Sequence, residues 1–245
     1  MALEYLEILS GLFSLFAVSL AFFIGFKIIS RYFEFKKREF LLVGITSITI
    51  TEPWWGSVIS FIIAVTMNNN GLYNYPTIYF LINNLLIPIG ILFWLIAISD
   101  LMFKKYKKQL IIFGIIYGCT FEITFLTLLF TDPSLIGTLI TPVDVEYHFI
   151  MAWFLLSTIL FILITGLFFA RESLKSDKKE IQLRGKLMFV GFLLFTIGAI
   201  LDSVLPLEAS SLIIARSILM SSSIFLYGGF ILPNWMKGIF LKENN

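Results

Sequence analysis

Long apolar runs, separated by short charged segments, dominate the pattern along the chain. A helix needs about 20 residues to cross the roughly 30 Å of hydrocarbon in a bilayer. Seven runs reach that length, and the polar stretches between them are too short for a separate soluble domain. We therefore predict an all-α fold in which residues 1–245 form a single polytopic membrane domain, a bundle of seven transmembrane helices. We expect these helices at residues 8–30, 40–66, 77–102, 109–131, 149–170, 187–206 and 210–232.

The composition indicates that the surrounding solvent is lipid. The chain is 58% hydrophobic and 14% charged, its mean hydropathy is +0.93, and 27 of its 245 residues are Phe. A soluble domain is typically about a quarter charged, so this composition excludes one. We expect a multi-pass integral protein of the cell membrane. Its one cysteine, Cys119, falls inside the fourth predicted helix and has no partner for a disulfide within the chain.

The basic residues are distributed on one side of the predicted bundle. Of the 18 Lys and Arg residues, all except Arg216 fall near the connections after the first, third and fifth helices or in the C-terminal tail. The positive-inside rule then places the N-terminus outside and the C-terminus in the cytosol, which an odd number of helices requires as well. These basic segments are expected to face anionic headgroups of the lipid bilayer, and we expect no nucleic-acid partner.

The segment "ITSITITEPWW", residues 45–55, places a carboxylate and a proline inside an apolar run. Its alternation of Ile and Thr resembles a strand, but an isolated strand cannot cross a bilayer with its backbone groups unpaired. A single helix kinked at Pro53 is the better prediction, because proline lacks an amide donor and clashes with the carbonyl of Thr49. The bend should aim Glu52 and one indole inward. Pro88 marks a second candidate hinge in the third helix.

Charged residues inside the predicted spans carry the most information, because each needs a partner, a cavity or a neutral form. Asp202 and Arg216 lie at matching depths on the sixth and seventh helices, which a short turn joins. We predict that these two residues form an ion pair in the outer half of the membrane. Glu52 and Glu122 each lie about 12 to 13 residues from the inner ends of their helices, or about 18 to 20 Å at 1.5 Å per residue.

The polar side chains of the outer half allow two interpretations, which the sequence leaves open. They could join helices by buried hydrogen bonds, each worth about 1 kcal/mol in a membrane. They could instead line a cavity open to the outside, where the two glutamates bind a proton or a cationic or hydrogen-bonding ligand. The candidate ligand-binding or proton-binding residues are Glu52, Glu122, Asn83, Asn84, Trp54 and Trp55.

The residue inventory argues against an enzyme, and we predict no catalytic residues. His148 is the only histidine, which excludes zinc centres that need two or three, so we expect no metal site. The G-x-S-x-G motif of many serine hydrolases is absent. An intramembrane aspartyl protease needs two Asp side chains at one depth, whereas Asp100 and Asp202 fall near opposite ends of their helices.

The sequence lacks the signature residues of several known classes of seven-helix protein. A retinal cofactor of the microbial type requires a lysine within the seventh helix, and that helix contains Arg216 but no lysine. We therefore expect no cofactor. The Asp-Arg-Tyr and Asn-Pro-x-x-Tyr signatures of G-protein-coupled receptors are also absent, as are the Pro-Gln pairs of sugar transporters with this topology.

The architecture, the "EPWW" of residues 52–55 and the exit "FILPNWMKGIF" of residues 230–240 together resemble a prokaryotic sensor module. This seven-helix module stands at the N-terminus of some histidine kinases. The resemblance covers the whole chain and implies a receptor-like or sensor-like function. The sequence ends twelve residues after Pro233 without an output domain, so we expect the signal to pass to a separate partner.

Our functional prediction is a sensor with a polar, acidic cavity in its extracellular half that admits a small molecule from the outside. The cytosolic segment of residues 171–186 is the candidate surface for a signalling partner, and its alternative interpretation is a solvated extension of two helices. One alternative function is a small-solute, proton-coupled or cation-coupled transporter, in which Pro53 and Pro88 serve as hinges. A second alternative is a structural subunit of a membrane complex.

Overall fold

The apolar runs fold as helices, because a helix satisfies its own backbone hydrogen bonds inside lipid. The computed structural model describes residues 3–67, 70–204 and 208–241, and in these residues seven helical spans are long and apolar enough to cross a membrane. They coincide with the seven predicted runs, as expected of a multi-pass membrane protein. Residues 205 and 206, the expected end of the sixth helix, lie outside the described residues. The spans are Tyr5–Phe35, Arg38–Thr66, Pro76–Leu101, Lys104–Thr131, Phe149–Leu174, Lys179–Val204 and Ser210–Ile231.

Several spans are built from more than one element. The elements in chain order are α1 (Tyr5–Phe35), α2 (Arg38–Thr49), the 3-10 turn η1 (Glu52–Trp54), α3 (Trp55–Thr66), α4 (Pro76–Asn84), α5 (Ile87–Leu101), η2 (Lys104–Tyr106), α6 (Lys107–Thr131), η3 (Pro133–Leu135), β1 (Gly137–Thr141), β2 (Asp144–Tyr147), α7 (Phe149–Leu174), α8 (Lys179–Val204), α9 (Ala209–Ile231) and α10 (Asn234–Phe240).

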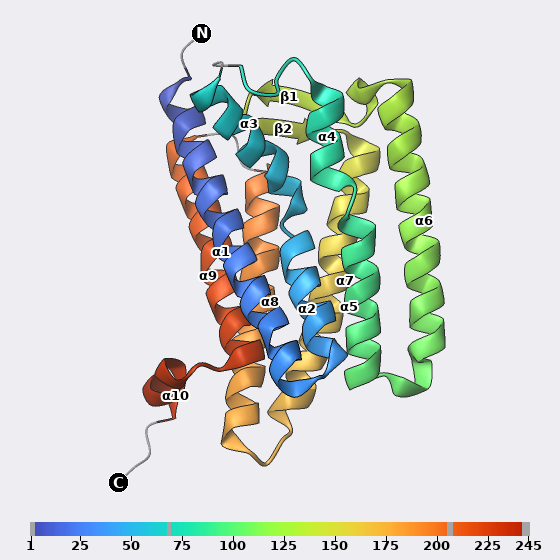
Figure 1. Ribbon diagram of the computed structural model, residues 1–245, viewed down its shortest axis with the longest axis vertical. Coiled ribbons are helices and arrows are strands. Elements are labelled where there is room, and N and C mark those ends of the chain that lie inside the picture. The colour runs from blue at the N-terminus through green and yellow to red at the C-terminus, as the bar shows by residue number, and fades with distance from the viewer. Residues whose placement is uncertain (1–2, 68–69, 205–207, 242–245) are drawn as a thin grey trace.

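The helices run up and down between two chemically different ends (Figure 1). One end, here called the hairpin end, carries the N-terminus of the chain and the strands β1 and β2. The opposite end, here called the basic end, carries the α1–α2, α5–α6 and α7–α8 connections and α10. The Lys and Arg residues of these connections therefore gather at one end of the bundle. Lys242 lies outside the described residues.

At Pro53, where the sequence predicts a kink, the structure has a complete break in the helix. α2 ends at Thr49, the 3-10 turn η1 follows, and α3 begins at Trp55. The third predicted helix is broken as well, because α4 ends at Asn84 and α5 begins at Ile87, with Pro88 in its first turn. Each break exposes the amide groups at the start of the following helix, which need hydrogen-bond acceptors.

The two broken helices supply those acceptors to each other. The carboxylate oxygens of Glu52 accept the amide of Leu86, at 2.7 and 2.9 Å, just before α5. In the other direction, Asn83 Oδ1 at the end of α4 accepts the amide of Gly56 at the start of α3. This reciprocal capping joins the two breaks into one unit.

A two-stranded hairpin covers part of the bundle at the hairpin end, and the sequence analysis did not predict it. β1 and β2 pair antiparallel, with Gly137 opposite Tyr147 and Leu139 opposite Val145. Val143, in the turn, is fully buried. The hairpin therefore packs on the helices and brings residues 144–147 toward the bundle interior.

Candidate functional site

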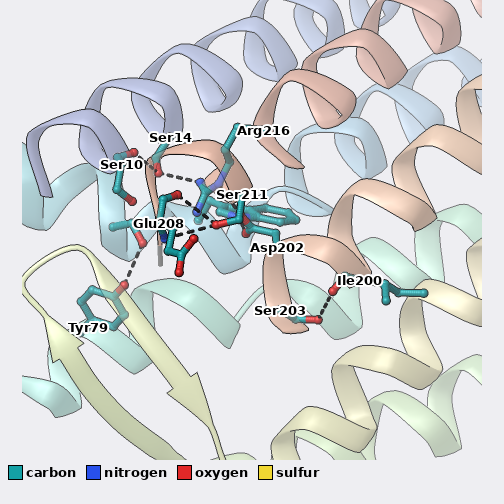
Figure 2. Close-up of polar contacts among 11 residues, drawn as sticks. Ser10, Ser14, Tyr79, Ile200, Asp202, Ser203, Glu208, Ser211 and Arg216 are labelled. Carbon is teal, nitrogen blue, oxygen red and sulfur yellow. Dashed lines mark hydrogen bonds and ion pairs between the residues drawn. The ribbon is translucent and has the colours of Figure 1, made fainter. Parts of the chain in front are cut away.

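Arg216 and Asp202 form the centre of a polar cluster at the hairpin end. Arg216 Nε donates to Asp202 Oδ1 at 2.6 Å, so the two residues that the sequence pairs are in contact. Figure 2 shows the guanidinium between Asp202 of α8 and Ser14 of α1. The Arg216 side chain is only 5% exposed and that of Asp202 16%. A buried pair of this kind is stable only if further hydrogen bonds satisfy its remaining polar atoms.

Two further side chains supply such bonds. Arg216 Nη1 donates to Ser14 Oγ at 2.7 Å, and Trp54 Nε1 donates to Asp202 Oδ2 at 2.7 Å. The guanidinium also lies over the Trp54 ring, 5.9 Å from its centroid. The sequence analysis missed Ser14, because a serine in an apolar helix usually bonds to its own backbone. Ser14 does that too, donating to the Ser10 carbonyl at 2.8 Å.

This cluster lies in the wall of a cavity of about 790 Å³. Its walls come from η1, the flanking parts of α2 and α3, α5, the hairpin, α7, α8 and α9. The volume falls within the range of about 300–1,000 Å³ that is typical of small-molecule sites. Of the residues predicted from the sequence, the cavity wall contains Pro53, Trp54, Asp202 and Arg216.

The cavity is polar near the hairpin and apolar in its depth. Its acidic and basic lining residues are Asp144, Glu146, Asp202 and Arg216, which are three carboxyl groups and one guanidinium, all close to the hairpin end. Ile162 of α7 also lines it and lies thirteen residues after Phe149, so the cavity extends about 20 Å into the bundle at 1.5 Å per residue. The deep wall is formed by Ile91, Ile159, Ile162 and Phe195, together with three threonines whose hydroxyls donate to backbone carbonyls of their own helices: Thr46, Thr49 and Thr158.

Exposed lining residues mark where the cavity reaches the surface. Ile140 of β1 is 51% exposed and Val204, the last residue of α8, is 73% exposed. Ala152, in the first turn of α7, is exposed as well. The mouth therefore lies between the hairpin, the start of α7 and the end of α8. Trp153 is 55% exposed beside it, and exposed Trp residues of membrane proteins gather where lipid meets water.

Three aromatic side chains lie beyond the deep end of the cavity, beside a second, smaller space. The Trp94 ring lies 5.6 Å from the Phe192 ring and 6.5 Å from the Phe230 ring, both in edge contacts. Trp94 Nε1 donates to Thr165 Oγ1 at 2.8 Å, which fixes the indole. A second space of only about 50 Å³ lies beside these rings and shares Thr46 with the main cavity. The main cavity therefore ends before the basic end of the bundle.

Asp144 and Glu146 are acidic residues of the site that the sequence analysis missed, and Asp144 is the less exposed of the two. It begins β2, lines the cavity and forms no ion pair within the part of the chain that the structure describes. Burial raises the pKa of Asp144 above its ordinary value, and the Asp202 carboxylate raises it further, while Arg216 opposes the shift. The alternation in "TLITPVDVEY" signals a strand, but the run is short and lies between two long helices.

Neither of the two candidate glutamates lines the cavity, a question that the sequence left open. Glu52 is 1% exposed, and its carboxylate faces the Leu86 amide between the broken helices. Glu122 lies half-buried on α6, and its Oε2 is buried without a hydrogen-bond partner in the described residues. The cavity is lined instead by the neighbouring Pro53 and Trp54 and by residues of α7, α8 and α9.

The two candidate asparagines support the hairpin from behind the cavity wall. Asn83 Nδ2 and Asn84 Nδ2 donate to the Tyr147 hydroxyl at 3.3 and 3.4 Å. Burial raises the pKa of Tyr147 to about 12, so this lining residue stays a neutral phenol near pH 7. Trp55 points to the other side of its helix and packs on Phe22 of α1, with ring centroids 5.2 Å apart. One indole of the pair, Trp54, therefore faces inward.

The polar groups that line the site can form hydrogen bonds and ion pairs with a small molecule. Between residues 3 and 241, outside the gaps at 68–69 and 205–207, no group of three His, Cys, Asp or Glu side chains is arranged to hold a metal ion. The polar cluster contains one arginine held by a carboxylate, a serine and an indole, with a second carboxylate nearby. Comparisons with protein-family models, curated proteins and solved structures find no match, so the interpretation rests on the geometry of this site.

Proposed function

We propose that the protein is a receptor-like or sensor-like membrane protein whose cavity receives a small molecule from the outer side and reports its presence at the cytosolic side. The observation that carries this proposal is the cavity of about 790 Å³, polar at its mouth and closed toward the basic end. Such concave, mostly apolar sites with a few polar groups are the usual places where small molecules bind. The orientation is the one that the positive-inside rule predicts.

The pair α8 and α9 supports a connection between the cavity and the basic end. Asp202 and Arg216 join the two helices beside the mouth. Gly191 allows close packing further along, since a Cβ atom there would lie 2.8 Å from a Leu226 side-chain atom. At the basic end, Arg184 of α8 donates to the carbonyl of Phe230 in α9 at 2.7 Å. A ligand that shifts the outer ends of this rigid pair has a direct route to the α7–α8 segment, residues 171–186.

One observation favours the alternative of a carrier. The space of about 50 Å³ beside Trp94 continues from the main cavity toward the basic end and includes Ser223. A carrier would open this space to the cytosol during turnover. Ser223→Cys, in a Cys119→Ala background, tests this directly. A receptor keeps the new thiol unreactive toward a membrane-impermeant reagent applied from the basic end, whereas a carrier exposes it when solute is present.

Ligand entry is tested by melting curves of the purified protein in nanodiscs with a panel of amines, alcohols and carboxylates of increasing chain length. At least one compound should raise the melting temperature of the wild type. Ala152→Trp, which fills the mouth at an exposed position, should abolish that rise. Binding stabilises a folded protein by mass action, so the rise should grow with ligand concentration.

Leu160→Trp is the matched control for the mouth variant. It adds the same indole to the same helix, two turns further along, at a lipid-facing position that does not line the cavity. This variant should keep the full rise. The proposal fails if no compound in the panel stabilises the wild type, or if Ala152→Trp and Leu160→Trp respond alike.

A further inference from the structure

The geometry points to a ligand class: a cationic amphiphile, such as a long-chain amine, with its cationic head at Asp144 and its apolar chain in the deep part of the cavity. This inference rests on the proposed function and deepens it by naming what the cavity takes. It is carried by the charge at the mouth, by the change from polar to apolar walls along the cavity, and by the position of the mouth.

The charge balance of the mouth favours a cation. Asp202 uses both carboxylate oxygens for protein donors, one for Arg216 and one for Trp54. The Arg216 charge is thereby already compensated within the protein. Asp144 and Glu146 remain without an ion-pair partner among the described residues, and Asp144 is the more enclosed of the two. An anionic head would meet two carboxylates there, whereas an ammonium group would supply the missing charge.

Aromatic side chains add to a site for an ammonium head. Trp54 and Tyr147 line the same cavity as Asp144, and aromatic faces attract cations by about 0.5–2 kcal/mol. Tyr147 and Asp144 are the two ends of β2, so the hairpin presents both. Arg216 occupies one side of Trp54, at 5.9 Å from the ring centroid.

The shape of the cavity favours a chain behind that head. Beyond the polar residues, the cavity continues between Ile91, Ile159 and Ile162, about 20 Å from the start of α7 at 1.5 Å per residue. The Trp94, Phe192 and Phe230 rings pack against one another beyond this end. The mostly apolar deep walls give a hydrocarbon chain a dry environment, and each buried methylene contributes about 0.8 kcal/mol.

The position of the mouth matches the place where amphiphiles are found. The exposed residues Ala152 and Val204 lie at the hairpin end of their helices, beside the exposed Phe149 and Trp153. Aromatic residues at a helix end mark the interface between hydrocarbon and water, which is where amphiphiles concentrate. A molecule can therefore reach the cavity from the outer leaflet without first dissolving in water.

Three probes with one chain and different heads test the inference: dodecylamine, dodecanol and dodecanoic acid. Their dissociation constants are measured near pH 7 by native mass spectrometry on protein in zwitterionic nanodiscs. The amine should bind at least tenfold more tightly than the alcohol, and the acid most weakly. Asp144→Asn should weaken amine binding at least tenfold and leave alcohol binding unchanged, while Asp144→Glu retains the preference for amine.

Asp132→Asn is the control, because Asp132 is an exposed carboxylate at the same end of the molecule that lies outside the cavity. It should bind all three probes as the wild type does. Equal affinity for amine and alcohol, or tight amine binding that survives in Asp144→Asn, would overturn the inference and leave the receptor proposal standing. Failure of all three probes, together with the wider panel, would overturn both.

Discussion

Arg216 joins three helices through one guanidinium group. It bonds to Asp202 of α8 and Ser14 of α1 while belonging to α9 itself, and it lies against Trp54. The deletion of one member of a buried pair leaves the other charge without compensation, which is the costly state. The residue therefore fixes how the three helices meet at the cavity mouth.

We predict that Asp202→Asn and Arg216→Gln each lower the free energy of unfolding by about 3–5 kcal/mol. The double variant should recover part of the loss, with a coupling energy of about 1–3 kcal/mol, because the two side chains touch. Reversible unfolding in mixed micelles gives the free energy of unfolding of the wild type, the two single variants and the double variant. Additive losses would show that the pair does not act as a unit.

Asp144 should have the opposite effect on stability. Because the protein raises its pKa from the ordinary value of 3.8, the protonated form is favoured in the folded state. Its stabilising contribution is then complete below pH 3.8 and is lost as the pH rises through the higher folded-state value. Asp202, Glu146 and Arg216 are the charged groups that act on it.

Asp144→Asn should therefore be at least as stable as the wild type near pH 7, and its stability should depend less on pH above pH 3.8. Each unit by which the pKa is raised corresponds to about 1.4 kcal/mol. Melting temperatures between pH 4 and pH 8, without ligand, test this expectation. A loss of stability at pH 7 would mean that the carboxylate is needed for the fold.

Among the elements, the two broken helices are joined at their breaks. Glu52 and Asn83 each satisfy a backbone amide on the other broken helix, so one amide at each break has its acceptor within the protein. In many transporters, the amides at such breaks bind substrate. Here the Leu86 and Gly56 amides are bound by Glu52 and Asn83, which favours a structural role for these two side chains.

Glu52 and Glu122 provide a matched pair for testing that role. Glu52→Ala removes the acceptor of the Leu86 amide and should cost about 1–3 kcal/mol, the usual effect of leaving a buried group unsatisfied. Glu122→Ala removes a carboxylate whose buried oxygen has no partner among the described residues, so it should be neutral or stabilising. Chemical denaturation compares the two variants, and equal losses would contradict the capping role.

The helices could be predicted from the sequence, because each must be apolar and satisfy its own backbone in lipid. The Asp202–Arg216 contact could be predicted as well, since charges in such spans are rare and their depths match. The Glu52 bond could not, because its partner is a backbone amide 34 residues away, which leaves no signal in the side chains. The position of Asp144 in the cavity wall could not be predicted either, because it depends on how a short hairpin packs on the bundle, and hydropathy carries no signal for that packing.

At the scale of the whole molecule, the orientation in the membrane decides what the cavity can sense. The hairpin end should face outside and the basic end the cytosol, because the positive-inside rule concerns short loops such as these. Single cysteines at Ser134 and Asp177, both exposed and at opposite ends, test this in a Cys119→Ala background. An impermeant maleimide on intact cells should label Ser134→Cys alone. Labelling of Asp177→Cys alone would show that the molecule has the opposite orientation, with the basic end outside.

The cavity and the surface proposed for a partner lie at opposite ends of the bundle, joined by α8 and α9. A receptor with this arrangement must change shape at its basic end when the cavity is filled. The change need be only about 1–2 Å, the size of helix shifts that couple many sites. The ligand itself need not pass the Trp94, Phe192 and Phe230 rings.

The most direct test is the distance between two spin labels at the basic end, attached at Lys37→Cys and Asp177→Cys in a Cys119→Ala background. Both positions are exposed, in the α1–α2 and α7–α8 connections. Pulsed electron resonance compares the protein with and without saturating dodecylamine in nanodiscs. We predict a shifted distance distribution that Asp144→Asn does not show. An unchanged distribution in protein that has demonstrably bound the amine would contradict a sensing function.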